Sequence, residues 1–484
     1  AIPAADCSGE LGVVPYYLAD CLLRNMPTDT TDALAAGRQI EVLTAAIKGL
    51  ESFVSAQGNE PQKAAPQTPD ALLKLGYCYQ RIAAQIAEPQ ERTQRLNAAR
   101  QAFDRIGQQY ATSPQAPVAT LERANCLVAA NDVNGAINEL NKFKADPFKQ
   151  APVAPLAYLR MGALLRSQNK ATEAAAALQE GRTNYENALM NDPTRAAWAP
   201  LLQYHHGLAI KDLARKDPAK LDVAKLNEAR TLFDNLKQRF PNSPQATDAG
   251  WRSGQCRREE HTPRLIAARA VLLRTDAKPE EIAAATTQLA DAVKQLTETA
   301  QYFVAQAGLA VQQKLAGTEV HQQLLYDAAW CYQWVADIEI DAARKKMVDE
   351  ALKKQAEEAA KQPAGLKGVV NVRIPEFAAA VIPVQPSEKL ARDQYAALIA
   401  ARPESPLSIN ARLELAEMQS RRDEVDPAIA LLNDALTQEP AADVEERLRM
   451  RLGVCLVAKK DFATAFAQYS AVAANATSPI APDA

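Results

Sequence analysis

Residues 113–147, SPQAPVATLERANCLVAANDVNGAINELNKFKADP, contain the pattern that recurs along the chain. Ser113-Pro114 predicts the start of a helix, because Ser is a favoured N-cap and Pro fits the first helical turn. Segment 131–135, with its Asn, Asp and Gly residues, predicts a turn and the start of a second helix. The stretch is therefore interpreted as one helix–turn–helix unit of about 34 residues. Its regularly spaced small and apolar residues are Ala124, Leu127, Ala136, Leu140 and Phe143.

The same spacing recurs along the sequence. Counted from a small residue in the first helix, small or apolar residues return at +3, +12, +16 and +19. Some units need an insertion between their two helices, which a repeat turn tolerates. Such units bury surface only against their neighbours, so the pattern predicts an all-α solenoid of stacked helical pairs. The small residues from which the units are counted are Gly76, Ala124, Gly162, Gly207, Ala329, Ala416 and Gly453.

These units resemble the tetratricopeptide repeat family over about residues 69–475. Their linkers are similar to those of bacterial extracytoplasmic members found in envelope assembly, and read YATSPQA at 110–116, FPNSPQA at 240–246 and ARPESPL at 401–407. The early Trp of the family is missing from nearly every unit, so the repeats are divergent. The resemblance implies a right-handed α-solenoid, a role in protein–protein contact and no catalytic activity.

Composition agrees with a helical protein and gives no sign of a nucleic-acid partner. Aromatic residues make up 6% of the chain, and 18 Gly against 29 Pro suit helices separated by prolines. A formal charge of −3 and a pI near 6.0 leave no basic excess for a phosphate backbone. No run of 18 apolar residues is present, so the sequence predicts no transmembrane segment.

No motif for catalysis or for a cofactor stands out. The histidines lack the spacing of metal ligands, since adjacent residues on a helix point about 100° apart. Glycine is sparse and never forms a phosphate-binding loop. We therefore expect no enzyme activity, no cofactor and no metal. The four histidines are His205, His206, His261 and His321.

The first residues bear on the compartment. The chain begins at Ala1 without Met, which we interpret as a mature end left by signal-peptide cleavage. The alternative is an end set by the fragment itself. Together with the linker type, the first interpretation predicts an extracytoplasmic location, whether secreted, cell-surface or periplasmic.

Five of the seven cysteines share one repeat phase, two residues after the small residue of a first helix. Equivalent positions of successive repeats are spaced apart, so we expect these thiols to be free and buried rather than metal ligands. Cys7 and Cys21 are assigned outside this phase and are the pair expected to form a disulfide in an oxidising compartment. The five cysteines in phase are Cys78, Cys126, Cys256, Cys331 and Cys455.

The domain organisation follows from changes in regularity along the chain. Residues 1–57 are predicted to be an N-terminal helical cap or degenerate repeat, and 69–260 regular repeats. Residues 261–386 are predicted to hold long helices and an extended, proline-containing strap, and 387–484 the C-terminal repeats and a tail. We expect His261-Thr262-Pro263 to interrupt a helix, and a later helix, about 320–361, to project beyond Trp334.

Residues 362–386 differ in composition from the rest of the chain, because four prolines forbid a long helix. Val370, Val372 and Ile374 alternate with polar residues, which predicts a short edge strand. Two interpretations remain open: a return strap along the projecting helix, or an apolar strap that a second molecule covers.

The C-terminal segment suggests how the protein works. Residues 476–484, ATSPIAPDA, match the internal linker 111–119, ATSPQAPVA, at seven of nine positions. We expect the last repeat to leave an apolar face that the first helices of another copy cover. Such a heterologous contact closes into a ring or extends as a filament, so we predict a non-enzymatic, self-assembling scaffold. The alternative is a monomeric adaptor that binds a peptide or envelope protein in its groove. The C-terminal segment would then be a tail folded back over the last helix, or the end of a truncated chain. The interaction candidates of the last repeat are Leu452, Leu456, Phe462, Phe466, Tyr469 and Pro479.

Thiol alkylation tests the cysteine assignment. We expect the denatured, unreduced protein to be labelled at the five repeat cysteines but not at Cys7 or Cys21, and reduction to expose both of the latter. Intact-mass and peptide analysis measures the labels. A disulfide that involves Cys78, Cys126 or Cys455 would contradict the phase argument.

Overall fold

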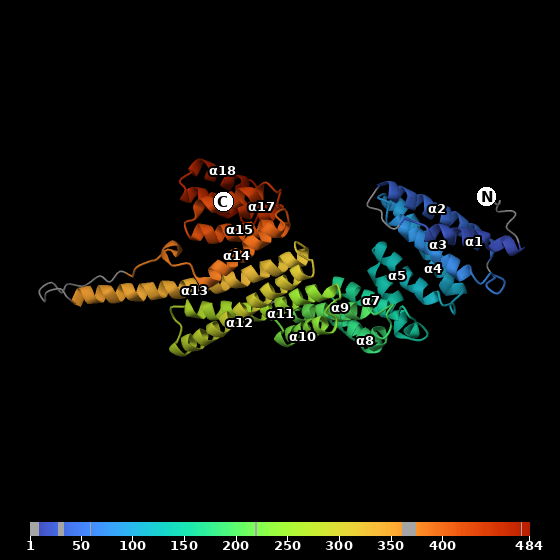
Figure 1. Ribbon diagram of the computed structural model, residues 1–484, viewed down its shortest axis with the longest axis horizontal. Coiled ribbons are helices and arrows are strands. Elements are labelled where there is room, and N and C mark those ends of the chain that lie inside the picture. Colours follow the sequence, from blue (N-terminus) through green and yellow to red (C-terminus); the bar gives the residue numbers. More distant parts are fainter. Residues whose placement is uncertain (1–8, 28–32, 59, 218–219, 361–373, 476) are drawn as a thin grey trace. The chain divides into compact units, whose positions relative to one another are not determined.

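The computed structural model of the chain describes residues 9–27, 33–58, 60–217, 220–360, 374–475 and 477–484. These residues form 18 α-helices and contain no β-strand, so the predicted all-α class is confirmed. The chain divides into two compact units, Ala1–Lys216 and Asp217–Ala484 (Figure 1).

The first unit is a stack of helical pairs. Each helix packs against the next, and two pairs of first helices also meet, α3 with α5 and α7 with α9. Its helices are α1 (Val14–Arg24), α2 (Ala33–Ala56), α3 (Thr68–Ala83), α4 (Pro89–Gln109), α5 (Ala116–Ala129), α6 (Val133–Asn141), α7 (Ala154–Ser167), α8 (Ala171–Met190) and α9 (Trp198–Ala214).

The second unit repeats the arrangement with longer helices. Here α11 meets α13, α13 meets α15 and α15 meets α17, in addition to the contacts between consecutive helices. Its helices are α10 (Val223–Arg239), α11 (Gln245–Leu272), α12 (Pro279–Gln312), α13 (Glu319–Ala360), α14 (Pro386–Ala401), α15 (Pro406–Arg421), α16 (Val425–Leu436), α17 (Ala442–Ala458) and α18 (Phe462–Ala473).

The predicted spacing has a direct structural meaning, because the small residue of each first helix faces a large residue of the second. A Cβ atom at Gly76 would overlap the Phe103 ring, and one at Gly453 would lie 2.6 Å from Tyr469. The large partners are the residues assigned to position +16 in these units. Glycine is therefore needed for the close approach of the paired helices, and the repeat assignment is confirmed.

One further repeat lies in α11 and α12, which contain no unit counted from the sequence spacing. A Cβ atom at Gly254 would overlap the fully buried Phe303 ring, as at Gly76. The insertion between these two residues is longer than that between Gly76 and Phe103, so a fixed spacing could not connect them.

The expected interruption at Pro263 is wrong, because α11 continues through it as one helix. Proline removes one backbone hydrogen bond from the helix interior. Burial on both sides offsets this loss: Trp251 and Cys256 precede the proline, and Leu265 and Ala268 follow it, all buried. Tertiary packing thus overrides the local preference.

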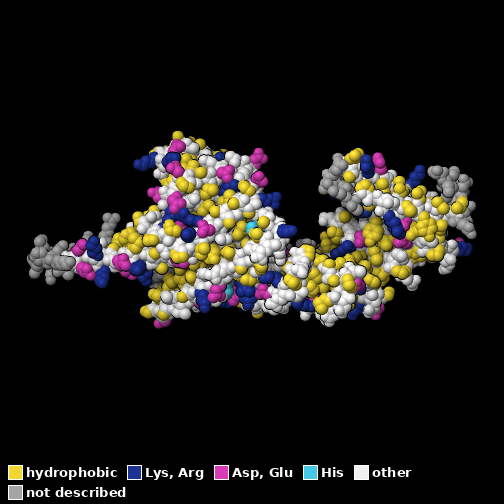
Figure 2. Space-filling view, in the orientation of Figure 1, with side chains coloured by type: hydrophobic (Ala, Val, Ile, Leu, Met, Phe, Trp, Pro, Cys, Tyr) yellow, Lys and Arg dark blue, Asp and Glu magenta, His cyan; other side chains and the backbone are white. Residues whose placement is uncertain are grey.

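The predicted projecting helix is α13, which runs past the helices packed on it (Figure 1). None of its described residues after Ala336 is buried. Basic and acidic side chains gather along its distal half (Figure 2). Lysine and acidic pairs alternate there four residues apart, such as Lys346 and Glu350, whose charged groups lie 4.0 Å apart. Such i,i+4 pairs stabilise a helix that lacks packing partners.

The serine-proline linkers and the C-terminal segment form the same turn. The Ser113 N–H donates to the Tyr110 carbonyl at 2.9 Å, and the Ser113 carbonyl accepts from Ala116 at 3.1 Å. Ser478 makes the equivalent bonds with Asn475 and Ala481, at 3.0 and 3.3 Å. The short 3-10 helix Ala481–Asp483 therefore begins at the position equivalent to the start of α5.

The five cysteines of the repeat phase are buried and form no disulfide, as predicted. Burial raises the pKa of the Cys78 thiol to about 12 and that of Cys126 to about 11. Both thiols are therefore protonated and unreactive at neutral pH.

Substitution of two glycines in one helical pair tests the close crossing. Gly76→Ala is expected to destabilise the first unit by about 1–3 kcal/mol, because the new methyl group overpacks against Phe103. Gly107→Ala in α4 is the matched control: no atom lies within 4 Å of a Cβ there, so a gain of about 0.5–1 kcal/mol is expected. Denaturant unfolding followed by circular dichroism measures both. Equal effects would contradict the assignment.

Candidate functional site

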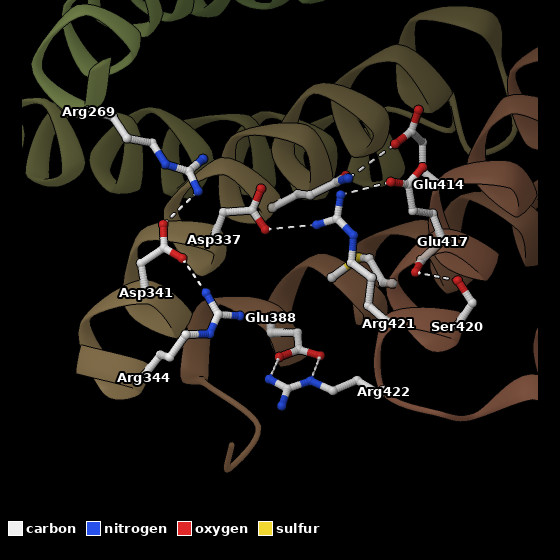
Figure 3. Close-up of polar contacts among 12 residues, drawn as sticks. Arg269, Asp337, Asp341, Arg344, Glu388, Glu414, Glu417, Ser420, Arg421 and Arg422 are labelled. Atoms are coloured by element: carbon white, nitrogen blue, oxygen red, sulfur yellow. Dashed lines mark hydrogen bonds and ion pairs between the residues drawn. The ribbon is translucent and has the colours of Figure 1, made fainter. Parts of the chain in front are cut away.

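The second unit contains a cavity of about 450 Å³ with a charged rim (Figure 3). Helix α13 forms one wall and α15 the other, and residues from α11 and α14 complete the lining. Ala336, Ile340 and Met418 supply apolar lining. The cavity was not foreseen from the sequence, since its residues come from four helices and from the segment before α14.

Ion pairs connect the helices around this cavity (Figure 3). Asp341 of α13 accepts hydrogen bonds from Arg269 of α11 at 2.6 Å and from Arg344 at 2.9 Å. Arg421 of α15 donates to Asp337 of α13 at 3.1 Å. Burial raises the pKa of Asp337, against the opposing charges of Arg421 and Arg269. These bridges hold α11, α13 and α15 in register.

The most buried charges of the cavity are Glu388 and Arg422, whose side chains are 3% and 4% exposed. The Arg422 Nε donates to Glu388 at 2.8 Å, and its Nη2 donates to the other carboxylate oxygen. Burial alone would raise the pKa of Glu388, but the hydrogen bond and charge of Arg422, with the charge of Arg392, outweigh it and lower the pKa. The carboxylate is thus held ionised inside the protein.

The same arginine holds the strap, here the described residues 374–385. Arg422 Nη1 donates to the carbonyls of Ala379 and Ile382, and Ile382 is 2% exposed. Arg344 Nε donates to the Phe377 carbonyl at 3.1 Å. Two arginines and one buried isoleucine therefore clamp an extended segment against the solenoid, in agreement with the return-strap interpretation.

The residues of the predicted edge strand add little to this clamp. Val370 and Val372 lie outside the described residues. Ile374 is described, is 68% exposed and belongs to no strand. Among the described residues, no group of three or more His, Cys, Asp and Glu side chains is arranged to hold a metal ion. No helix in the described ranges is both long and apolar enough to cross a membrane.

In the last repeat, the candidate interaction residues separate into core and surface. Leu452 and Leu456 are buried in the core of the C-terminal helices, and Tyr469 is half-buried over Gly453. Phe462 and Phe466 of α18 are 64% and 74% exposed. The exposed apolar face is therefore narrower than the sequence suggested. Pro479 is also exposed, in the C-terminal segment.

The two phenylalanines occupy positions that meet the next repeat elsewhere in the chain. Counted from Tyr469, Phe462 is equivalent to Leu96 of α4, which is 7% exposed and lines a cavity with Glu122 and Cys126 of α5. Phe466 is equivalent to Arg230 of α10, which forms an ion pair with Glu260 of α11 at 3.8 Å. We call Phe462 and Phe466 the downstream face.

Helix α1 exposes the complementary positions. Its small residue is the fully buried Ala19, whose Cβ would lie 3.5 Å from a Cβ at Gly49 of α2. Cys21 is therefore two residues after a small residue, and its assignment outside the repeat phase is wrong. Cys126 occupies the equivalent position in its repeat and accepts a hydrogen bond from Gln80 of the preceding first helix at 3.2 Å. Cys21, by contrast, is exposed.

The residue before Ala19 is also exposed at a position whose equivalent contacts the preceding repeat. Leu18 is equivalent to Arg123 of α5, which pairs with Asp104 of the preceding α4 at 2.6 Å. Leu18 is 59% exposed. We call Leu18 and Cys21 the upstream face, because their equivalents contact the preceding repeat. Cys7 lies outside the described residues, so its disulfide with Cys21 stays a prediction.

Comparisons with known proteins agree with the repeat type. Residues 43–194 match the family described as tetratricopeptide repeat-like domain. No curated protein matches the sequence. The helical pairs within these residues are therefore similar to tetratricopeptide repeats.

Solved structures provide distant similarities. A monomeric mutant of IFIT1 with Gppp-AAAA has 11% identity and a TM-score of 0.32, and the match covers 99% of this chain and 85% of that chain. A chain of the APC/C hetero-tetramer Cut9-Hcn1 has 15% identity, coverages of 97% and 90%, and a TM-score of 0.25. Yeast Tom70 has 13% identity, coverages of 96% and 92%, and a TM-score of 0.22.

Removal of the buried arginine tests the clamp. Arg422→Leu is expected to cost about 3–5 kcal/mol of stability, because it leaves Glu388 buried and unpaired. It should also accelerate amide hydrogen exchange in the strap. The control Arg421→Gln breaks a half-exposed pair and should cost less than about 1 kcal/mol.

A double variant separates the two roles of Arg422. Glu388→Leu combined with Arg422→Leu should regain most of the lost stability, because no unpaired charge remains, while exchange in the strap stays fast. Slow exchange in this double variant would show that the arginine does not hold the strap.

Proposed function

We propose that this chain of tetratricopeptide-like repeats is a scaffold that assembles with copies of itself, head to tail. The downstream face of one molecule docks on the upstream face of the next. Helices α18 and α1 then meet in the same way as the second helix of one repeat and the first helix of the following repeat meet inside the chain. The repeat fold itself implies a role in protein–protein interaction.

This proposal rests on the exposure of residues at junction positions, which are the positions that contact a neighbouring repeat elsewhere in the chain. Positions that are buried or ion-paired at internal junctions hold Phe462 and Phe466 in α18 and Leu18 in α1, all more than half exposed. Large apolar residues are unfavourable in water, and burial of each contributes about 1.5–3 kcal/mol. The two faces are thus suited to contact each other, because the downstream face corresponds to the side of a repeat that meets the next repeat and the upstream face to the side that meets the preceding one.

The difference between the two faces decides the kind of assembly. The two faces are different surfaces, so the contact is heterologous and generates a ring or an open filament rather than a closed dimer. On the basis of the linker type, we further propose that assembly occurs outside the cytoplasm, at a bacterial cell envelope or surface. Fractionation of the native source, with detection of the protein by antibody, tests this location.

A second candidate function is a monomeric adaptor. Two cavities, of about 440 and 380 Å³, lie on either side of α3, against α5 and α1. Tyr77, Arg81 and Asn125 contribute to their lining, which suits an extended peptide with polar groups. A wild type that remains a monomer at high concentration would favour this function.

Complementary face variants test the assembly. Phe466→Glu blocks the downstream face and Leu18→Glu the upstream face, so each variant alone is expected to be monomeric. Their mixture retains one intact face of each kind and should form a dimer and nothing larger. Size-exclusion chromatography with light scattering measures all three samples.

A control and a reporter make this test specific. Leu273→Glu changes a residue that is 73% exposed but lies outside both faces, so assembly should persist. Under reducing conditions, Cys21 should be protected from alkylation in the wild-type assembly and reactive in Phe466→Glu. Assembly of both single face variants would overturn the proposal.

A further inference from the structure

Consecutive first helices contact each other at a fixed register, counted from their small residues. Position −2, two residues before the small residue of one first helix, meets position +4 of the preceding first helix. Gln333 at +4 of α13 donates to the Glu414 carboxylate at −2 of α15 at 3.1 Å. Arg258 at +4 of α11 likewise forms an ion pair with Asp327 at −2 of α13. The small residues of these helices are Gly254, Ala329 and Ala416.

Position +1 of the preceding first helix belongs to the same contact, because it lies about one turn before position +4. Lys74 at −2 of α3 forms an ion pair with Asp20 at +1 of α1 at 2.7 Å. Arg451 at −2 of α17 forms one with Glu417 at +1 of α15 at 3.0 Å. The side chain at −2 therefore lies beside positions +1 and +4 of the preceding helix, and the contact is polar at these junctions.

Helices α1 and α17 depart from this pattern on their outer sides. Among the described residues, no first helix follows α17 and none precedes α1. Val454 at +1 and Val457 at +4 of α17 are 46% and 43% exposed, and Tyr17 at −2 of α1 is 51% exposed. Positions that are polar at the internal junctions thus hold apolar or aromatic side chains here. Exposure of such side chains to water is unfavourable, and their mutual contact removes it.

We propose that, in the head-to-tail assembly, Tyr17 of one copy packs between Val454 and Val457 of the preceding copy. This inference rests on the proposed function and adds to it a surface of α17, which the downstream face does not include. Cys21 at +2 of α1 meets Val457 in the same register. Inside the chain, the equivalent Cys126 accepts a hydrogen bond from Gln80 at +4 of α3 at 3.2 Å.

The C-terminal segment does not fill the space beside these valines. Ile480 and Asp483 line a cavity of about 310 Å³ together with Met450 and Val454 of α17, and Val457 is not part of that lining. An aromatic ring that enters this space would exclude water from apolar groups of both molecules.

The apolar character of the contact selects the partner. At internal junctions, position −2 holds charged side chains such as Lys74 and Arg451, which would lose their ion pairs between two valines. Tyr17 brings no charge to the contact. The surface on α17 therefore suits the α1 end of a second copy and rejects a first helix with a charge at position −2.

Disulfide cross-linking tests the register. Val457→Cys is introduced together with Cys7→Ser, so that Cys21 cannot form its predicted disulfide with Cys7. Mild oxidation is expected to link the new thiol to Cys21 of the neighbouring copy, which gives a ladder of oligomers on non-reducing denaturing gels. Cys21→Ser should abolish the ladder. In the control Val381→Cys, the thiol replaces a valine that is 58% exposed but lies in the strap, and no ladder is expected.

Light scattering of the same samples separates this inference from the proposed function. Assembly without a ladder in the Val457→Cys variant would overturn the register and leave head-to-tail assembly standing. A wild type that does not assemble would overturn both. A ladder that persists after Cys21→Ser would also contradict the register, because another thiol would then form the link.

A charge pair provides a second test, since Val457→Arg and Tyr17→Asp recreate the internal pair of Arg258 and Asp327. Each single variant should associate about tenfold more weakly, because an unpaired charge then meets an apolar surface. Both substitutions in one chain should restore association and make it sensitive to salt. Circular dichroism confirms that the variants fold. Failure of the double variant to recover association would overturn the direct contact.

Discussion

The contact between a small residue and a large one, where the two helices of a pair cross, is the constraint on which the repeats depend. At Gly76 and Gly254 there is no room for a methyl group, because an aromatic ring fills the space above the glycine. This contact brings the helices close enough for their other apolar residues to meet. It tolerates any length of connection, since it constrains only the crossing point. Hence one geometry accommodates both the short connection between Gly453 and Tyr469 and the long one between Gly254 and Phe303.

The buried Glu388–Arg422 pair has a different role, because it holds an extended segment against the helical stack. A strap offers backbone carbonyls that helices cannot satisfy. Arg422 supplies donors to two of them, and Glu388 neutralises the charge of the arginine inside the protein. A buried ion pair is seldom a strong source of stability. Here it gives the strap a unique position.

The exposed faces are explained by the stacking of the repeats. In a solenoid, each repeat is stabilised by contact with its neighbours, so junction positions are apolar or paired wherever a neighbour is present. Leu18 and Phe466 hold apolar side chains at such positions and stand in solvent. Their exposure is unfavourable in an isolated molecule, whereas association with a matching surface removes it.

The sequence by itself determined the helical class, the repeat spacing and the burial of five cysteines, because these follow from local periodicity and from the size of single residues. It also indicated the projecting helix and the return strap, since proline and alternating charges act locally. Only the tertiary structure decided that Pro263 stays inside a helix, that Gly254 pairs with Phe303, and that Arg422 clamps the strap. It also placed Leu452 in the core and Phe466 in solvent. These outcomes depend on which residues from distant segments meet, and neither composition nor spacing contains that information.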